Sequence, residues 1–240
     1  MIDIYMTSFF RSHMTERAIN EIHSRTKKGT FQIHVFDNGS DKSTRNDLIF
    51  LMEAGLIKSL HLDSRNTGCR YNKGIFHMMT ESTNPYYVVT DNDVYPPQLT
   101  PDWLEQMLQI METHKRIAFL TPQIPPQGLQ MPIQVAPKVV YCKAVGNTFK
   151  MVRREAFPLN QFEVKLGEFS DDSYVCNYVR DKGWQVAFCR DVYCLHAGQC
   201  ENWGYTQSQI ALDPRKQNYG VPFTYPVDPT TYMPPESMRM

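Results

Sequence analysis

The 240 residues are enough for one large α/β domain or two small ones, with volume for a sizeable hydrophobic core. Hydrophobic residues make up 42% of the chain and the formal net charge is zero, which excludes a disordered protein and a general nucleic-acid binder. We therefore expect a folded protein with no obvious nucleic-acid patch.

The first residues carry no export or membrane-spanning pattern. Asp3, Thr7 and Ser8 interrupt their apolar residues, no basic segment precedes them, and no stretch of the chain approaches the length of a membrane span. The cysteines form neither a CxxC pair nor a zinc-ligand spacing. They are Cys69, Cys142, Cys176, Cys189, Cys194 and Cys200. We expect reduced thiols in a cytoplasmic protein, with Cys176 and Cys189 as small core residues.

Strand and helix patterns alternate over the first half of the chain. Strands are predicted over residues 2–6, 31–36, 57–62 and 86–89. Helices are predicted from Ser12, taken as an N-cap, from Ser43 to Gly55, and from about Cys69. This alternation predicts a mostly parallel central sheet with helices on both faces.

The second half of the chain adds further elements to this sheet. A helix over residues 99–112 has a Trp and Met stripe that we expect in the core, and strands follow over 117–120 and 147–152. The Pro- and Gln-rich residues 122–137 are expected to be irregular or a short hairpin. A helix from Asp171-Asp172 precedes two strand-like pieces, 184–188 and 191–195, and then His196. Residues 201–240 form a Pro- and Tyr-rich tail that we expect to wrap the surface or to be partly mobile.

The most informative segment is YYVVTDNDVY, residues 86–95. A short apolar run, typical of a buried central strand, ends at Asp91-Asn92-Asp93. Carboxylates two residues apart in a tight turn can converge on Mg²⁺ or Mn²⁺, which prefer oxygen ligands. Ligands of open α/β sheets bind at the carboxyl ends of strands, where this turn is expected. A plain Asx-rich turn remains an alternative for this motif taken alone.

Other polar residues follow the neighbouring strands and should lie at the same edge of the sheet. Asp37 comes at the tip of the second strand, where we expect an exposed turn carboxylate. Asn66 and Gly68 lie in the loop after the third strand. Asp171-Asp172 and His196 lie farther along the chain, at a predicted helix start and a predicted strand end.

Four segments in this order resemble GT-A glycosyltransferases of the family 2 type, the inverting nucleotide-sugar transferases. They are VFDNGSDKST, RNTGCRYNKGI, VVTDNDVYPP, and FSDDSYVCNYVRDKGW leading to VYCLH. The resemblance runs from Ile2 to about His196. It implies the α/β GT-A fold, the Rossmann-like fold of nucleotide-diphospho-sugar transferases. It also implies a single domain with a nucleotide-sugar-binding half (1–121), an acceptor and catalytic half (122–200) and the tail (201–240).

The resemblance also implies roles for individual residues. Asp37 would accept a hydrogen bond from the nucleobase, and the loop after the third strand would cover the nucleotide. The implied nucleotide and donor contacts are Thr7, Ser8, Asp37, Asn66, Gly68, Asn72, Asp91 and Asn92. The DxD aspartates Asp91 and Asp93, with His196, would hold Mn²⁺ or Mg²⁺.

Asp172 aligns with the catalytic base of the family, and Asp171 precedes it. The chain departs from the family pattern here, because the first acid is Asp in place of Glu and a following acidic position is lost. Tyr178 also stands where an arginine is frequent. These departures concern residues that the resemblance assigns to donor binding, and they do not change the position of the predicted base.

The chemistry of sugar transfer accounts for these residue types. A diphosphate leaving group gains negative charge as the sugar bond breaks, and a divalent ion can offset that charge. Inversion requires one base for the acceptor hydroxyl, and a carboxylate at a helix N-terminus tends to stay ionised. The predicted activity is metal-dependent, inverting transfer from a UDP-sugar or similar donor to a glycan, lipid-linked or other hydroxyl acceptor.

Two other functions stay open at this point. A nucleotidyltransferase on a related scaffold would carry a Gly-rich basic loop after the first strand, and residues 7–11 contain no glycine. A catalytically inactive nucleotide-sugar-binding protein would not need the catalytic aspartates. Individually, Asp37 and Asp172 could merely cap a turn and a helix, and His196 could be a hydrogen-bonded surface residue.

Overall fold

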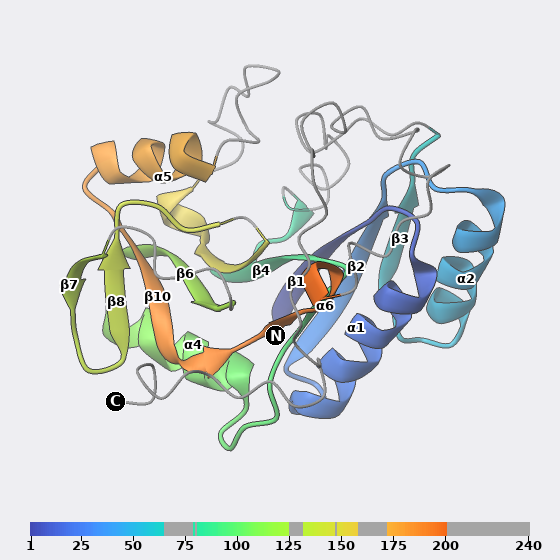
Figure 1. The fold of residues 1–240 in the computed structure, drawn as a ribbon, viewed down its shortest axis with the longest axis horizontal. Helices are drawn as coiled ribbons and strands as arrows, with labels where there is room; N and C mark the ends of the chain where they lie inside the picture. Colours follow the sequence, from blue (N-terminus) through green and yellow to red (C-terminus); the bar gives the residue numbers. More distant parts are fainter. Residues whose placement is uncertain (65–78, 80, 125–131, 147, 158–171, 201–240) are drawn as a thin grey trace.

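A computed structural model describes residues 1–64, 79, 81–124, 132–146, 148–157 and 172–200. Its largest element is a nine-stranded sheet with the strand order β3-β2-β1-β4-β9-β6-β10-β8-β7 (Figure 1). This sheet runs through both predicted halves of the chain. The division into a donor half and an acceptor half remains a prediction.

The first four strands of the sheet are parallel, as the sequence predicts. They are β1 (Ile2–Ser8), β2 (Phe31–Asp37), β3 (Ser59–Leu62) and β4 (Tyr86–Asp91). Their register aligns Ser8 with Asp37 and Thr7 with Asp91. The carboxyl ends of β1, β2 and β4 therefore meet at one edge, as expected for an open parallel sheet.

The later strands continue the sheet with mixed directions. β9 (Phe149–Arg153) lies antiparallel between β4 and β6 (Ile117–Gln123), and β10 (Gln185–Tyr193) runs parallel to β6. β8 (Val139–Cys142) and β7 (Pro132–Val135) form an antiparallel hairpin at the far side. All of these strands except β8 and β9 point the same way, which confirms a mostly parallel central sheet.

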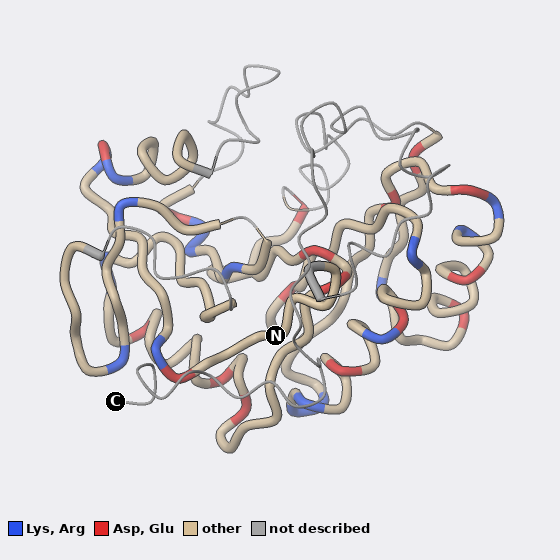
Figure 2. The backbone as a smooth tube through the Cα atoms, viewed as in Figure 1, with Lys and Arg blue, Asp and Glu red and all other residues tan. Residues whose placement is uncertain are grey.

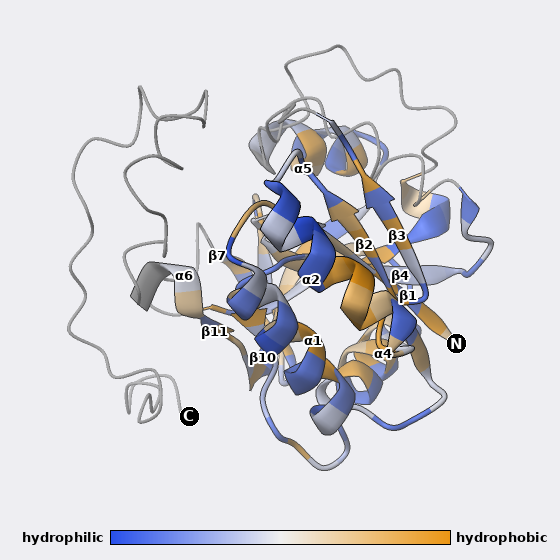
Figure 3. Cartoon of the chain, turned by 90° about the vertical axis from the view of Figure 1, so that its right-hand side faces the viewer, coloured by the Kyte–Doolittle hydropathy of each residue, from blue (hydrophilic) through white to orange (hydrophobic). Residues whose placement is uncertain are grey.

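Helices cover both faces of the sheet. The helices α1 (Ser12–Arg25), α2 (Lys42–Glu53) and α4 (Trp103–Thr113) contribute buried residues to one core cluster. The helix α5 (Asp172–Asp181) contributes Val175, Cys176 and Val179 to a second cluster on the opposite face. Figure 3 shows hydrophilic residues on the outward sides of α1 and α2, which is the pattern of amphipathic surface helices.

A small second sheet joins the end of the described chain to the central turn. The strand β11 (Leu195–His196) pairs antiparallel with β5 (Val94–Tyr95), and the short helix α6 (Ala197–Cys200) follows it. This pairing brings residues far apart in the sequence to the carboxyl end of β4.

Several predicted boundaries differ from the structure. Ser12 is the first residue of α1 and not its N-cap; Arg11 occupies the cap position without a side-chain cap bond. The pieces 184–188 and 191–195 are mostly one strand, β10, whose pairing with β6 shifts register. α4 begins later than predicted because Asp102 caps it by accepting a hydrogen bond from the Glu105 amide.

The remaining predictions concern the loop regions and the cysteines. β7 lies within residues 122–137, as a short hairpin there would require, but its partner β8 lies beyond them and was not predicted. The helix predicted from Cys69 lies outside the described residues. Cys142, Cys176, Cys189 and Cys194 are buried and form no disulfide. None of the helices in the described part of the chain is both long and apolar enough to cross a membrane.

Candidate active site

The predicted DxD turn lies between β4 and β5, and its second carboxylate is almost completely buried. Asp93 is 1% exposed. Nη1 of Arg11 lies 2.7 Å from Oδ2 of Asp93, and Nε2 of His196 lies 3.3 Å from Oδ1. A buried charge is costly unless it is paired, and here the carboxylate has a cation on one oxygen and an imidazole beside the other.

Opposing effects set the ionisation of Asp93. Burial acts to raise the pKa of its carboxyl group, but the hydrogen bond from His196 and the positive charge of Arg11 outweigh burial and hold the pKa well below its usual value. Asp93 therefore stays a carboxylate in spite of its enclosure. Both an arginine partner and a metal ion require this ionised carboxylate.

The β5–β11 pairing places His196 beside Asp93. His196 is the register partner of Val94, and the Ala197 amide donates a 2.8 Å hydrogen bond to the Asp93 carbonyl. A Cβ atom added to Gly198 would lie 2.1 Å from Oδ2 of Asp93 and 2.9 Å from Nη1 of Arg11. Glycine is thus required at this position for the backbone of α6 to approach the ion pair.

Arg11 reaches Asp93 from an unusual turn after β1. Phe10 and Arg11 both have positive φ angles, 49° and 53°, which residues other than glycine rarely adopt. Nη2 of Arg11 donates to Oδ1 of Asn92 at 3.0 Å, and Nδ2 of Asn92 donates to Oγ1 of Thr15 at 2.8 Å. This network ties the β1–α1 turn to the turn after β4.

Two predicted donor contacts belong to the same interior network. Asn92 is 2% exposed, and the Ser8 side chain is fully buried, with its hydroxyl 3.1 Å from that of Thr15. Thr7 is only half-buried at the end of β1, opposite Asp91, which is also half-buried. In this arrangement Thr7 and Asp91 are the more accessible of the predicted donor contacts on β1 and β4.

The expectation of an exposed Asp37 is wrong. This residue is fully buried, because the Ser40 hydroxyl donates to its Oδ1 and the Ser40 amide donates to Oδ2 at 3.1 Å. Nε of Arg45 lies 3.3 Å from Oδ2. Burial raises the pKa of Asp37, although the hydrogen bonds from Ser40 and the charge of Arg45 oppose that rise. The Phe10 amide also donates to the Ser40 hydroxyl, at 2.7 Å.

The donor set around Asp93 fits a divalent cation in part. The 3.3 Å separation between Oδ1 of Asp93 and Nε2 of His196 is close to the ~3 Å expected between neighbouring ligands of a six-coordinate ion. Within the described ranges, however, no three His, Cys, Asp or Glu side chains cluster around one point. The structure thus joins Asp93 with His196 and leaves Asp91 apart from them.

The predicted base lies at the start of α5. Asp172 is the first residue of that helix, as predicted, and α5 packs on the sheet face that carries Tyr5 and Tyr87. In Figure 1 the chain enters α5 at the end nearer β4 and leaves it toward β10. The Asp172 side chain, Asp171 and the predicted loop contacts Asn66, Gly68 and Asn72 lie outside the described residues.

Sequence reasoning missed three residues that shape this site. Arg11, Ser40 and Gly198 were not predicted as site residues, yet they contact Asp93 or Asp37 directly. The available signals were weak: an arginine three residues after the first strand, a serine in the turn after the second, and a glycine two residues after His196.

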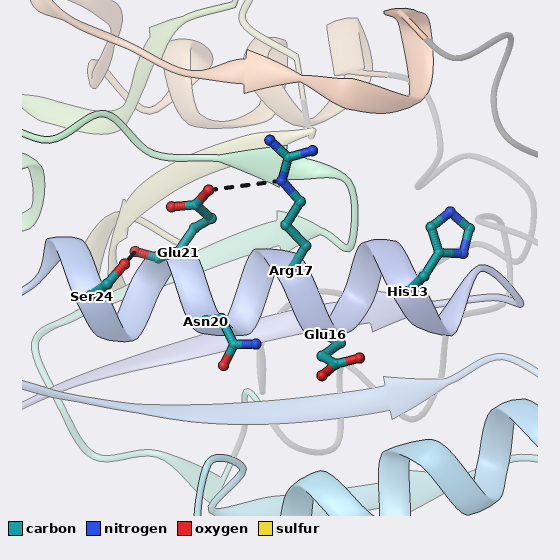
Figure 4. Close-up of a pocket in the computed structure, with 6 residues that line it drawn as sticks. All are labelled: His13, Glu16, Arg17, Asn20, Glu21 and Ser24. Atoms are coloured by element: carbon teal, nitrogen blue, oxygen red, sulfur yellow. Dashed lines mark hydrogen bonds and ion pairs between the residues drawn. The ribbon is translucent and has the colours of Figure 1, made fainter. Parts of the chain in front are cut away.

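A second surface region lies along the outer side of α1. An open, polar hollow follows α1, and Arg17 lies there beside Glu21 (Figure 4). Its lining residues are His13, Glu16, Arg17, Asn20, Glu21 and Ser24. Figure 2 shows Lys and Arg interleaved with Asp and Glu over several elements of the described chain. The hollow contains none of the site residues predicted from the sequence.

Comparisons with known proteins identify related sequences and structures. A family model described as Glycosyl transferase family 2 matches residues 3–157. The structure of GalNAc-T7 with UDP, GalNAc and Mn²⁺ has a TM-score of 0.64 and 13% identity, covering 82% of this chain and 44% of that one. The mannosyltransferase PcManGT from Pyrobaculum calidifontis, with GDP-Man and Mn²⁺, has a TM-score of 0.62 and 15% identity, covering 88% and 59%.

A third similar structure is residues 1–349 of TarS from S. aureus with UDP-GlcNAc. Its TM-score is 0.55 and its identity 13%, with 81% of this chain and 58% of that one covered. The chain thus spans less than two thirds of each of these structures. At such identities the likeness shows the fold alone, and that fold is the predicted one. No curated protein matches the sequence.

The contact between Gly198 and the ion pair can be tested by substitution. Gly198→Ala should lower the free energy of unfolding by about 1–3 kcal/mol, because its Cβ overlaps Oδ2 of Asp93. Chemical denaturation measures this loss. In an Asp93→Ala background the same substitution should cost clearly less, since the overlapping atom is gone. An equal cost in both backgrounds would contradict the proposed contact.

Proposed function

Because the chain belongs to glycosyl transferase family 2, we propose that it transfers a sugar from a nucleotide-diphosphate donor to a hydroxyl acceptor. The observation that carries this proposal is the Asp91-Asn92-Asp93 turn at the carboxyl end of β4, next to β1, with His196 beside Asp93. Open α/β sheets bind their ligands at this edge.

We propose a nucleoside-diphosphate sugar as the donor, with uridine as the first choice. GalNAc-T7 and TarS were solved with UDP and UDP-GlcNAc, and PcManGT with GDP-Man. The half-buried Thr7 and Asp91 would contact the donor most directly. Asp37 would accept a hydrogen bond from the base only after the Ser40 hydroxyl turns away from it, because that hydroxyl now occupies Oδ1.

The proposal includes a Mn²⁺ or Mg²⁺ ion held by Asp93, His196 and Asp91. Such an ion, when bound, offsets the charge that develops on the leaving diphosphate. Two structural neighbours were solved with Mn²⁺. In the chain itself, the hydrogen bond from His196 and the charge of Arg11 keep Asp93 ionised, and the β5–β11 pairing fixes the imidazole of His196 at its side.

Asp172 is the proposed base. A helix N-terminus favours the ionised form of a carboxylate, so a base at the first residue of α5 is ready to accept the proton of an acceptor hydroxyl. One base without a protein nucleophile gives a single displacement and an inverted anomeric centre. The acceptor would be a glycan, a lipid-linked sugar or another hydroxyl compound.

A donor panel tests the proposed activity. With Mn²⁺ and a set of nucleotide sugars, the protein should slowly release nucleoside diphosphate from one donor, and excess chelator should abolish this release. Asp93→Asn should lower it strongly, whereas Asp47→Asn, on the exposed side of α2, should leave it unchanged. No donor bound or consumed would contradict the transferase proposal and favour another function. Full activity in excess chelator would contradict the proposed role of the metal ion.

Asp172→Asn tests the base. The amide keeps the shape but cannot accept the proton, so turnover should fall by roughly 10²–10⁴-fold while donor binding survives. Asp181→Asn, at the other end of α5 and exposed, is the matched control and should turn over normally. Asp171→Asn should have a smaller effect than Asp172→Asn.

Normal turnover of Asp172→Asn, or a product with the anomeric configuration of the donor, would contradict this assignment. If Asp171→Asn is inactive while Asp172→Asn is active, the base is Asp171 and not Asp172.

A further inference from the structure

Arg11 lies where a metal cation bound to Asp93 would otherwise place its positive charge. Its Nη1 lies 2.7 Å from Oδ2 of Asp93, and the whole residue is only 8% exposed. An arginine at this distance neutralises much of the carboxylate charge, and a metal ion needs that same charge. We propose that Arg11 is an internal counter-cation of Asp93 and that a divalent metal ion binds Asp93 in competition with it. This inference rests on the metal site of the proposed function and concerns its control.

The backbone holds Arg11 in this position. Two successive left-handed residues, Phe10 and Arg11, are unfavourable, and such conformations persist only where the surrounding structure determines them. The Phe10 amide donates to Ser40, while the Arg11 carbonyl accepts hydrogen bonds from the Met14 and Thr15 amides at 2.9 and 3.2 Å. The guanidinium is therefore placed at Asp93 by the fold, which distinguishes it from a long surface side chain that visits a carboxylate by chance.

The two oxygens of Asp93 have different surroundings. Oδ2 is enclosed by Arg11 and by Gly198, where even a methyl group would overlap it. Oδ1 faces His196, whose Nε2 lies 3.3 Å away. A metal ion could thus approach Oδ1 while Arg11 remains at Oδ2. The metal ion and the guanidinium would then share the single negative charge of Asp93 in a buried site of low dielectric constant.

This sharing weakens metal binding to the free protein. Like charges close together in a poorly screened site repel each other, so either Arg11 must withdraw or the ion must bind weakly. A nucleoside diphosphate brings additional negative charge and would offset this repulsion. Binding of the ion and the diphosphate would then be mutually favourable, because coupling between two ligands is reciprocal.

The test measures Mn²⁺ binding to the free protein without any donor, by titration with detection of free Mn²⁺ by electron paramagnetic resonance. Arg11→Gln should bind Mn²⁺ about tenfold or more tightly than the wild type, because it removes a positive charge that competes with the ion for Asp93. Arg11→Lys keeps a cation and should stay near the wild type. The control Arg17→Gln removes an exposed arginine of α1, the helix that follows Arg11, and should change nothing.

Two further measurements keep the inference falsifiable. The gain in Arg11→Gln should vanish in the double variant Arg11→Gln/Asp93→Asn. If Arg11→Gln alone fails to fold, millimolar Mn²⁺ should restore its folding, since an ion that replaces the guanidinium binds only the folded state. An Arg11→Gln affinity equal to or weaker than that of the wild type, a gain that survives Asp93→Asn, or no rescue by Mn²⁺ would overturn the inference.

These outcomes are separable from those of the donor panel. If donor turnover occurs and needs Mn²⁺ but Arg11→Gln leaves the Mn²⁺ affinity unchanged, the proposed function stands and the competition fails. If Arg11→Gln tightens Mn²⁺ binding as expected but no nucleotide sugar is bound or consumed, the competition stands and the proposed function fails.

Discussion

The buried ion pair between Arg11 and Asp93 is the constraint on which the rest of the site depends. The two residues are separated by 82 positions in the sequence and lie in the turns that follow β1 and β4. Removing one partner of a buried pair typically costs about 3–5 kcal/mol, because an uncompensated charge remains inside the protein. The backbone of α6 can close over this pair only because residue 198 is glycine.

Two carboxylates support the β1–α1 turn. Asp93 binds the Arg11 guanidinium, and Asp37 binds the Ser40 hydroxyl that accepts the Phe10 amide. The acids that the family resemblance assigns to the metal and to the nucleobase are thus also the acids that fix this turn.

Local patterns in the sequence were sufficient to predict the strands and the edge of the sheet at which they end. Apolar runs that stop at Asp37 and at Asp91 predict both strand ends, and parallel order brings those ends together. The burial of Asp37 could not be predicted, because turn chemistry does not reveal that Ser40 and Arg45 fold back onto it. The role of Arg11 was equally hidden, since its partner lies on another strand and its turn has left-handed residues without glycine.

A double-mutant cycle on the ion pair tests the central claim most directly. The free energies of unfolding of the wild type, Arg11→Met, Asp93→Asn and the double variant would be measured by chemical denaturation without metal or nucleotide. The account predicts a coupling energy of at least ~2 kcal/mol between the two residues, with the double variant less destabilised than the sum of the single ones. If the losses of unfolding free energy in the two single variants add up to that of the double variant within ~0.5 kcal/mol, the account is contradicted, because additive losses indicate independent sites.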